Sequence, residues 1–238
     1  MNAPAPALYT RNWSFSSLMN FETCPMRFKL KQIDRLPELP RPPDNPMERG
    51  NRIHKRLELF VQGEGPMDHE ARAIDAFLDA LNDLRELYAR GIAITEDDWL
   101  FNRDWEQCDK TSPWLWAKLD FCVQDKPRST VIVGDYKSGK SAYKAVEHVQ
   151  QLQLYAAVAA LMYEWADTII AELWYVDEGH VKQLEFTREE ALRLVGRFQV
   201  RADKIYEEKL WKPNPNVMSC KYCAYGPRNG TGACPVGI

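Results

Sequence analysis

Two carboxylates and a lysine close to apolar segments are the side chains of this sequence best suited to chemistry. Asp120 belongs to AKLDF, and Asp135 and Lys137 belong to VIVGDYK. Side chains on a strand alternate, so Asp135 and Lys137 project to the same face, and a hairpin brings Asp120 close to them. Converging carboxylates suit Mg²⁺ or Mn²⁺, which activate water and polarise phosphodiesters, while Lys137 orients that water or stabilises developing charge. The alternative is an ordinary Asp–Lys pair on a strand surface.

A second signal lies upstream, in an apolar-periodic segment at 47–62 that predicts a helix. Gly50, His54 and Glu58 fall on one line beside its apolar face. A glycine inside a helix costs roughly 1 kcal/mol relative to alanine, so we expect a strand or a DNA backbone to approach closely there. His54 is either a metal ligand or a partly buried helix histidine.

Polar and basic residues accompany both segments. Gln151 and Tyr155 stand one turn apart on an expected helix at 144–164, where they either support the site or form an ordinary border between polar and core positions. Arg52 lies beside His54, and Lys140 follows the strand. Such charges commonly form a solvated face, but near a metal site they suit a phosphate track.

The same strand also matches a phosphate-binding pattern. G-x-x-x-x-G-K-[ST] is satisfied by Gly134, Gly139, Lys140 and Ser141. Leu173–Glu178 provides a second apolar segment that ends in acid. A carboxylate at Asp135 would repel a polyphosphate inside such a loop, whose backbone N–H groups wrap anionic oxygens. We therefore favour the metal site and keep a nucleotide hydrolase using Gly134–Ser141 as an alternative.

Together these residues resemble the RecB-like branch of the PD-(D/E)XK nuclease superfamily. The resemblance covers G-x-x-x-H-x-x-L-E at Gly50–Glu58, Leu119-Asp120, Gly134–Lys137 and Q-x-x-x-Y at Gln151–Tyr155, in the family's order. It implies an α/β fold in which flanking helices cover a mixed central sheet, the restriction-endonuclease-like core. A minor departure is Ala117, where the family often has glycine.

The resemblance also implies roles. Mg²⁺ or Mn²⁺ would be held by His54, Asp120, Asp135 and the backbone carbonyl of Tyr136. The catalytic residues would be Asp120, Asp135, Lys137 and His54. DNA binding and support of the site would fall to Gln151, Tyr155, Arg52 and Lys140. Weaker candidates are Glu58 and Glu96, of which Glu96 matches an acidic residue often present upstream.

Six cysteines in a chain expected in a reducing cytosol are more typical of free thiols or metal ligands than of disulfides. Cys220 and Cys223 form a C-x2-C pair, followed by Cys234 in a tail of irregular composition that can wrap a metal centre. A fourth thiolate is then required, and Cys24 in FETCPMRF is the best candidate. The other two cysteines lie in the expected strand region.

The pattern S-x-L-x-x-F-x-x-C-P-x-x-F resembles the opening of iron–sulfur members of the same branch, similar to CRISPR-adaptation and phage-encoded exonucleases. In them one N-terminal and three C-terminal cysteines hold a structural [4Fe–4S] cluster. Here the ligands would be Cys24, Cys220, Cys223 and Cys234. Ten residues separate Cys223 from Cys234, more than is usual in the family. A structural Zn²⁺ site is the alternative, because cysteines serve both centres.

Composition is ordinary for a soluble globular chain, at 238 residues, 45% hydrophobic and 27% charged. Three parts are expected: an N-terminal helical segment at 1–46 with one cluster cysteine, a nuclease core at 47–186, and a C-terminal helix and cysteine-rich tail at 187–238. No apolar run approaches the ~20 residues that span a bilayer, and the N-terminus lacks a signal-peptide pattern. We therefore expect a cytoplasmic protein with no membrane partner.

These signals predict a metal-dependent DNA exonuclease that prefers single-stranded DNA or DNA ends and carries a structural cluster. A net charge of -3 argues against a global basic field but not against a local basic groove. The absence of helicase motifs favours a stand-alone nuclease of the phage-recombination or CRISPR-adaptation type, with partner proteins from those processes. The alternative from another class is a noncatalytic DNA-binding or assembly subunit with the same fold.

Overall fold

The computed structural model describes residues 11–40, 42, 45–67 and 70–236, so parts of the expected segment 1–46 lie outside the described residues. The chain divides into two compact units. One combines Met1–Pro42 with Phe198–Ile238, and the other contains Pro43–Arg197. Both ends of the chain therefore belong to one unit, whereas the residues expected to form the metal site belong to the other.

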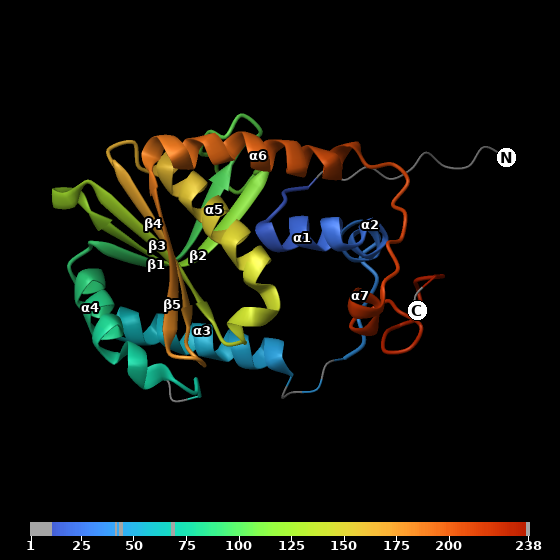
Figure 1. The fold of residues 1–238 in the computed structure, drawn as a ribbon, viewed down its shortest axis with the longest axis horizontal. Helices are drawn as coiled ribbons and strands as arrows, with labels where there is room; N and C mark the ends of the chain where they lie inside the picture. The colour runs from blue at the N-terminus through green and yellow to red at the C-terminus, as the bar shows by residue number, and fades with distance from the viewer. Residues whose placement is uncertain (1–10, 41, 43–44, 68–69, 237–238) are drawn as a thin grey trace. The chain divides into compact units, whose positions relative to one another are not determined.

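A mixed five-stranded sheet with strand order β1-β2-β3-β4-β5 forms the centre of the second unit (Figure 1). The strands are β1 (Ala93–Phe101), β2 (Leu115–Asp125), β3 (Thr130–Lys137), β4 (Thr168–Tyr175) and β5 (His180–Thr187). Neighbouring strands are antiparallel except β3 and β4, which are parallel. The hairpin expected between β2 and β3 is present and turns through η3 (Lys126–Arg128). The expected α/β fold with a mixed central sheet is confirmed.

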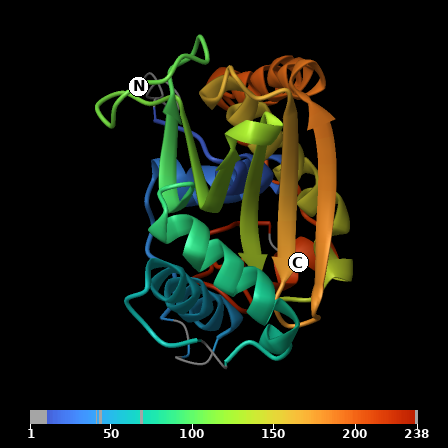
Figure 2. The same ribbon diagram turned by 90° about the vertical axis from the view of Figure 1, so that its left-hand side faces the viewer.

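Helices cover both faces of this sheet. Parallel strands need a crossover connection, and η4 (Ser141–Lys144) and α5 (Ala145–Met162) supply it between β3 and β4. The opposite face is covered by α3 (Pro46–Gln62), η2 (Ile74–Phe77) and α4 (Leu78–Ala89), which lie in front of the sheet in Figure 2. The core on that side combines apolar residues of α3 and α4 with Phe121, Tyr136 and Trp174 from the strands.

The helix α6 (Arg188–Glu207) begins at a capping box formed by Thr187 and Glu190. The backbone N–H of Thr187 donates to Glu190 Oε2 at 2.9 Å, and the N–H of Glu190 donates to Thr187 Oγ1 at 3.2 Å. The boundary between the two units falls within α6, after Arg197. Neither α6 nor any other helix in the described part of the chain is long and apolar enough to cross a membrane.

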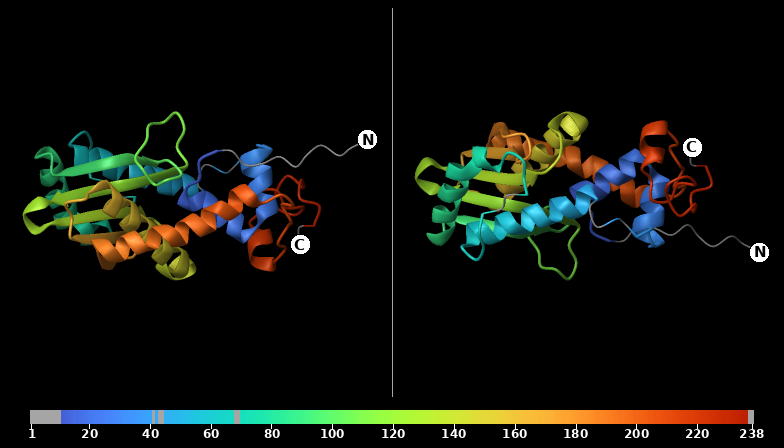
Figure 3. Two further views of the ribbon diagram at one scale, coloured as in Figure 1. Left: turned by 90° about the horizontal axis from the view of Figure 1, so that it is seen from above. Right: turned by 90° about the horizontal axis from the view of Figure 1, so that it is seen from below.

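The first unit joins the two ends of the chain around buried aromatic rings. Its helices are α1 (Phe15–Thr23), α2 (Pro25–Phe28), the π-helical η1 (Lys29–Ile33) and α7 (Val217–Lys221). Trp211 stacks on Phe28 with ring centroids 5.8 Å apart, and it meets Phe21 edge-on at 6.1 Å. The C-terminal tail consequently lies beside α2, as both views in Figure 3 show.

The nucleotide-hydrolase alternative is wrong for this structure. A phosphate loop has to leave its strand after the first glycine, so that successive N–H groups can wrap the phosphates. Here Gly134–Lys137 are strand residues paired with Glu172–Tyr175 of β4. The backbone N–H of Ser141 donates to Glu178 Oε2 at 2.8 Å. The pattern therefore coincides with a strand end and a short 3-10 turn, and no phosphate cradle forms.

Candidate metal centre

Strand register brings three carboxylates together. The β1–β2 register places Glu96 opposite Asp120, because the residue pairs on both sides of them are in line. The β2–β3 ladder ends at Phe121–Gly134, and the next residues along, Asp120 and Asp135, follow directly where the pairing stops. Opposite residues of an antiparallel pair have Cβ atoms about 4.5–5.5 Å apart. The hairpin therefore brings Asp120 and Asp135 close together, as the sequence predicts.

Asp120 links three elements through its two oxygens. Its Oδ1 lies 3.0 Å from Nδ1 of His54, which reaches it from α3. Its Oδ2 accepts the backbone N–H of Tyr136 at 2.6 Å. Because this side-chain bond takes up an N–H of β3 just past the last β2–β3 pair, the carboxylate stands where a backbone partner would otherwise continue the ladder.

The glycine before Asp135 is required by packing. A Cβ on Gly134 would lie 1.9 Å from Cζ of Phe121, the residue paired with it across the hairpin. The ring of Phe121 therefore lies flat against the bare backbone of β3, a close approach that only glycine permits. This contact sets the spacing of β2 and β3 immediately beside the carboxylates.

His54, Glu96 and Asp120 form a compact set of metal donors in the described part of the chain. Each offers one ligand atom, and these atoms all lie within 4.8 Å of one another. Glu96 has φ 50°, a left-handed conformation that residues other than glycine seldom adopt and that tends to persist at functional sites. Its carboxylate also forms an ion pair with Lys118. Glu96 is thus a stronger candidate than its sequence position suggests.

Asp135 is held from the α5 side. Its Oδ1 lies 3.0 Å from Oη of Tyr155 and accepts a hydrogen bond from Nε2 of Gln151 at 3.2 Å. Its other oxygen forms an ion pair with Lys137. Tyr155 Oη also lies 2.9 Å from the carbonyl oxygen of Lys118. The Q-x-x-x-Y pair therefore orients Asp135, and this carboxylate stands beside the compact donor set.

Burial and mutual repulsion dominate the electrostatics. Asp120 and Asp135 are each only 7% exposed. Burial, and then the charge of Asp135, raise the pKa of Asp120 to about 6. Burial alone would lower the pKa of His54, but its hydrogen bond to Asp120 and the charges of both aspartates raise it. The site therefore concentrates negative charge that a cation would stabilise.

The residues present fit a divalent cation. Carboxylate oxygens are the preferred ligands of Mg²⁺, and an imidazole nitrogen beside them is compatible with Mn²⁺. The repulsion that raises the pKa of Asp120 would be relieved by a bound cation. His54, Glu96 and Asp120 would hold it directly, and Asp135 lies close enough to influence their charge.

One comparison with known proteins shows the family of this chain. The sequence profile of the PD-(D/E)XK nuclease superfamily matches residues 12–228. The chain belongs to the PD-(D/E)XK nuclease superfamily. The crystal structure of SSO0001 is 17% identical with a TM-score of 0.41, covering 98% of this chain and 90% of that one. A phage-related exonuclease from Haemophilus somnus 129PT is 11% identical with a TM-score of 0.32, covering 84% and 95%. Neither TM-score is high enough to carry an argument, and a search of curated proteins found no match.

Three candidates lie outside this superfamily centre. Glu58 pairs with Lys55 on its own helix. Arg52 donates to Glu70 at 2.6 Å, and Lys140 is exposed. Of these three, only Glu58 carries a carboxylate, and it does not join the compact donor set of His54, Glu96 and Asp120 in the described residues. Arg52 and Lys140 stay predicted DNA contacts.

Two side chains beside the nuclease centre were not predicted from the sequence. Lys118 is the ion-pair partner of Glu96, and alternation along β2 places it on the same face as Asp120. His148 stands one turn before Gln151 and lies 2.6 Å from Oη of Tyr175 through its Nδ1. Burial, and then the nearby lysines, lower the pKa of His148 to about 4, so it is neutral at neutral pH. Helical and strand periodicity around the motifs could have found both.

A cavity in the first unit is lined by four cysteines, Cys24, Cys220, Cys223 and Cys234. The backbone N–H of Asn214 donates to Sγ of Cys24 at 3.4 Å. The remaining cysteines lie elsewhere: Cys122 is buried in β2, and Cys108 lies between β1 and β2. The structure therefore gathers the same four cysteines that the sequence singles out.

Proposed function

We propose that this chain is a RecB-like, metal-dependent DNA exonuclease that acts on single-stranded DNA or DNA ends. The observation that carries the proposal is the convergence of His54, Asp120 and Asp135 beside Lys137 where β2 and β3 cease to pair. Membership of the nuclease superfamily and a donor set suited to a divalent cation support the reaction class.

The chain's own residues divide the work. A bound Mg²⁺ or Mn²⁺ would polarise the scissile phosphodiester and lower the pKa of the attacking water. Lys137, paired with Asp135 and 22% exposed in its side chain, can hold that water or meet charge that develops on the phosphate. Gln151 and Tyr155 keep Asp135 from rotating away. Preorganised donors of this kind act without reorganisation during the reaction.

The DNA path is proposed to run along basic residues that follow β3. Lys140 is exposed, and Lys144 has a side chain that is 63% exposed at the start of α5. Together with Lys137 they form a short track suited to phosphates leading from the centre. The preference for single strands or ends, and partner proteins of recombination or CRISPR adaptation, rest on the resemblance of the motifs to the RecB-like branch.

We further propose a structural [4Fe–4S] cluster on the four cysteines of the first unit. The four cysteines line one cavity. The choice of a cluster over zinc rests on the resemblance of the cysteine motif to the iron–sulfur members of the branch. The N–H donated to Cys24 is the kind of hydrogen bond that tunes cluster thiolates.

The decisive experiment replaces Asp135 with asparagine. Degradation of labelled DNA in Mn²⁺ should fall by at least about 100-fold, because the carboxylate that orients Lys137 loses its charge. Substrates labelled at either end, single- and double-stranded, together with a closed circle, report polarity and end dependence. Asp104→Asn, an exposed carboxylate outside the site, is the matched control.

Three outcomes would contradict the proposal. Undiminished degradation by Asp135→Asn would remove Asp135 from the site. DNA that binds to the wild-type chain but stays intact in Mn²⁺ would favour the noncatalytic subunit. Cleavage of the closed circle would replace the exonuclease assignment with an endonuclease.

A further inference from the structure

The turn between β4 and β5, residues 176–179, makes hydrogen bonds to the end of β3, to α3, to the segment before η2 and to the start of η4. The backbone N–H of Val176 donates to the carbonyl of Lys137 at 3.0 Å, and the N–H of Ala73 donates to the carbonyl of Val176 at 3.0 Å. Asp177 and Glu178 follow directly. These are the acids of the segment LWYVDE, which the nuclease motifs leave without a role.

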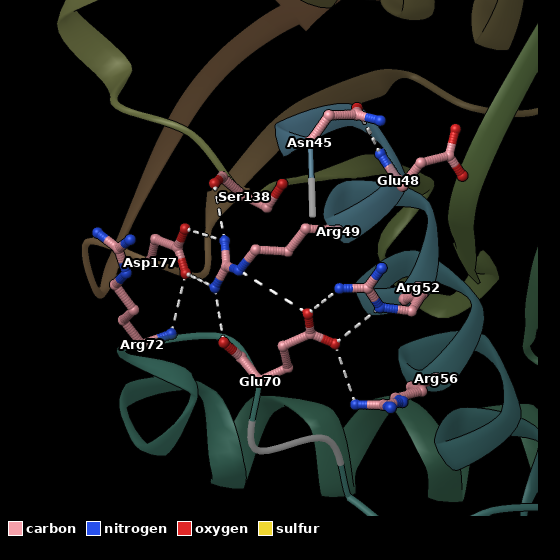
Figure 4. A network of polar contacts seen from close by, with 9 residues as sticks. All are labelled: Asn45, Glu48, Arg49, Arg52, Arg56, Glu70, Arg72, Ser138 and Asp177. Carbon is pink, nitrogen blue, oxygen red and sulfur yellow. Dashed lines mark hydrogen bonds and ion pairs between the residues drawn. The ribbon is translucent and has the colours of Figure 1, made fainter. Parts of the chain in front are cut away.

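Asp177 receives the guanidinium of Arg49 in a forked arrangement. Nη1 of Arg49 lies 2.7 Å from Oδ2 and Nη2 lies 2.9 Å from Oδ1, as Figure 4 shows. Two parallel bonds of this kind fix an angle as well as a distance. Asp177 Oδ1 also accepts the backbone N–H of Arg72 at 2.9 Å. The acid is therefore saturated with donors from two other segments.

Arg49 extends the connection beyond Asp177. Its Nη1 donates to the carbonyl of Ser138 at 3.3 Å, and its Nη2 donates to the carbonyl of Glu70 at 2.6 Å (Figure 4). Ser138 directly follows Lys137 at the end of β3. One planar group on α3 thus contacts the β4–β5 turn, the end of the catalytic strand and the loop before η2.

The backbone of α3 lies very close to the same serine. A Cβ on Gly50 would stand 3.0 Å from Oγ of Ser138, tighter than most real contacts. The close neighbour that a mid-helix glycine requires is therefore a side chain just past β3, whereas the sequence suggested a strand or DNA backbone. Arg49 and Gly50 together set the height of α3 against the end of β3.

Glu178 connects the start of η4, a few residues after the end of β3, to the same turn. Its Oε2 accepts the backbone N–H of Ser141 at 2.8 Å, and this hydrogen bond lowers the pKa of Glu178. Ser141 opens η4, which leads into α5 and its Gln151. The β4–β5 turn therefore makes hydrogen bonds both to the helix that carries His54 and to the segment that leads to Gln151.

Burial makes the Arg49–Asp177 pair costly as a mere stabiliser. The side chain of Asp177 is 9% exposed and that of Arg49 is 21% exposed. Burial would raise the pKa of Asp177, but the hydrogen bonds from Arg49 and from the backbone N–H of Arg72, together with the charges of both arginines, outweigh burial and lower the pKa. Buried ion pairs often add little net stability compared with apolar residues, so a role in fixing geometry accounts better for this one.

We propose that Arg49 and Asp177 are positioning residues of the nuclease, which hold α3 so that His54 meets Asp120 beside Lys137. His54 lies five residues after Arg49 on the same helix. A rotation or slide of α3 would move its imidazole away from Asp120, now 3.0 Å distant. This inference rests on the proposed function, since the positioned group is a ligand of the proposed metal centre.

The test measures Mn²⁺ affinity by calorimetry or electron paramagnetic resonance, alongside kcat and KM for DNA. In Asp177→Asn, the carboxylate loses its charge and one of its two acceptor oxygens becomes an NH2 group that cannot accept from Arg49. Mn²⁺ should then bind about 10- to 100-fold more weakly, as is typical when a group supporting a metal ligand is removed. KM for DNA should stay within twofold. Raising Mn²⁺ should restore most of kcat, which a merely structural role would not produce.

Arg49→Lys provides a second variant that keeps the charge and is mild enough to fold. A lysine ammonium cannot serve Asp177, Ser138 and Glu70 at once, so Mn²⁺ affinity should fall here too. The matched control is Asp125→Asn, which breaks a different Asp–Arg pair, the one with Arg128 at the β2–β3 turn. Its Mn²⁺ affinity should equal that of the wild type.

The outcomes separate this inference from the proposed function. If wild type binds Mn²⁺ and Asp120→Asn does not, the centre exists. If Arg49→Lys and Asp177→Asn then bind Mn²⁺ within twofold of wild type, or lose thermal stability alone, the positioning role is overturned while the nuclease centre stands. If wild type binds no Mn²⁺, both fall together.

Discussion

At the scale of single residues, Asp120 connects the other members of the site, because its carboxylate lies among groups from α3, β1 and β3. It contacts His54, accepts the N–H of Tyr136 and lies opposite Glu96 across the strand pair. Burial and the charge of Asp135 then raise its pKa to about 6, compared with 3.8 for an ordinary aspartate. A carboxylate so placed reduces stability when ionised, which is the expected cost of a site built to attract a cation.

The pH dependence of the metal-free protein follows from this shift. The unfolded chain releases the Asp120 proton near pH 4 and the folded chain only near pH 6, so stability falls as pH rises through about 6. Asp120→Asn removes this loss. We expect the variant to be more stable than wild type at pH 8 by on the order of 1–3 kcal/mol, with the difference vanishing towards pH 4.

Urea unfolding of both proteins in a chelator between pH 4 and pH 8 measures this difference. Asp104→Asn, an exposed aspartate, serves as the control and should leave the pH profile unchanged. A variant that is less stable than wild type at pH 8 would contradict the account of the Asp120 charge.

At the scale of elements, the β2–β3 hairpin is the part that sets the spacing of the carboxylates. Phe121 lies on Gly134, and these two residues form the last pair of the ladder. Glycine in a strand normally weakens it, so its presence beside Asp135 marks the close approach of the ring. The glycine that resembled part of a phosphate loop is therefore a packing requirement of the nuclease hairpin.

Gly134→Ala should destabilise the chain by about 1–3 kcal/mol, because the added methyl group overlaps the ring of Phe121. Replacing the ring by the smaller leucine side chain, in the double variant Phe121→Leu/Gly134→Ala, should recover part of that loss. Chemical denaturation followed by circular dichroism measures both variants.

Gly139→Ala is the matched control for this prediction. A Cβ at Gly139 meets nothing within 4 Å, so its effect should stay within about 0.5 kcal/mol. Equal destabilisation by the two substitutions would refute the packing explanation for Gly134.

At the scale of the whole molecule, the chain uses its two ends for one unit and its middle for the other. The four cysteines lie in the unit made from both ends, and the metal donors lie in the other. A cluster on these cysteines would tie the N-terminal helices to the tail and close a very long loop, which is where a cross-link gains most in principle.

Cys24→Ser should abolish the broad visible absorbance expected of the protein purified without oxygen, and should lower its iron content. Residues of the first unit should become more sensitive to protease, because the clip between the chain ends is lost. Mn²⁺ binding should persist, since its ligands belong to the other unit.

Cys108→Ser is the control, because Cys108 lies between β1 and β2 and does not line the cavity. It should retain full colour and iron. A colourless wild-type protein that contains stoichiometric zinc would replace the cluster with the zinc alternative.

The sequence alone predicted the superfamily, and it singled out side chains that the structure brings close together. Strand alternation, a short hairpin and helical periodicity predict which side chains share a face. These rules were enough to group the candidates Asp120, Asp135, Lys137 and His54. These are local rules, which depend on neighbours a few residues away. The mixed sheet followed from the same patterns.

The remaining features of the molecule are visible only in the folded chain. The left-handed backbone of Glu96, the fork between Arg49 and Asp177, and the gathering of Cys24 with the tail cysteines join residues far apart in the chain. The structure also removed the phosphate-loop alternative, because pairing with β4 keeps Gly134–Lys137 extended. Such features depend on how packed elements approach one another, so no short stretch of residues encodes them.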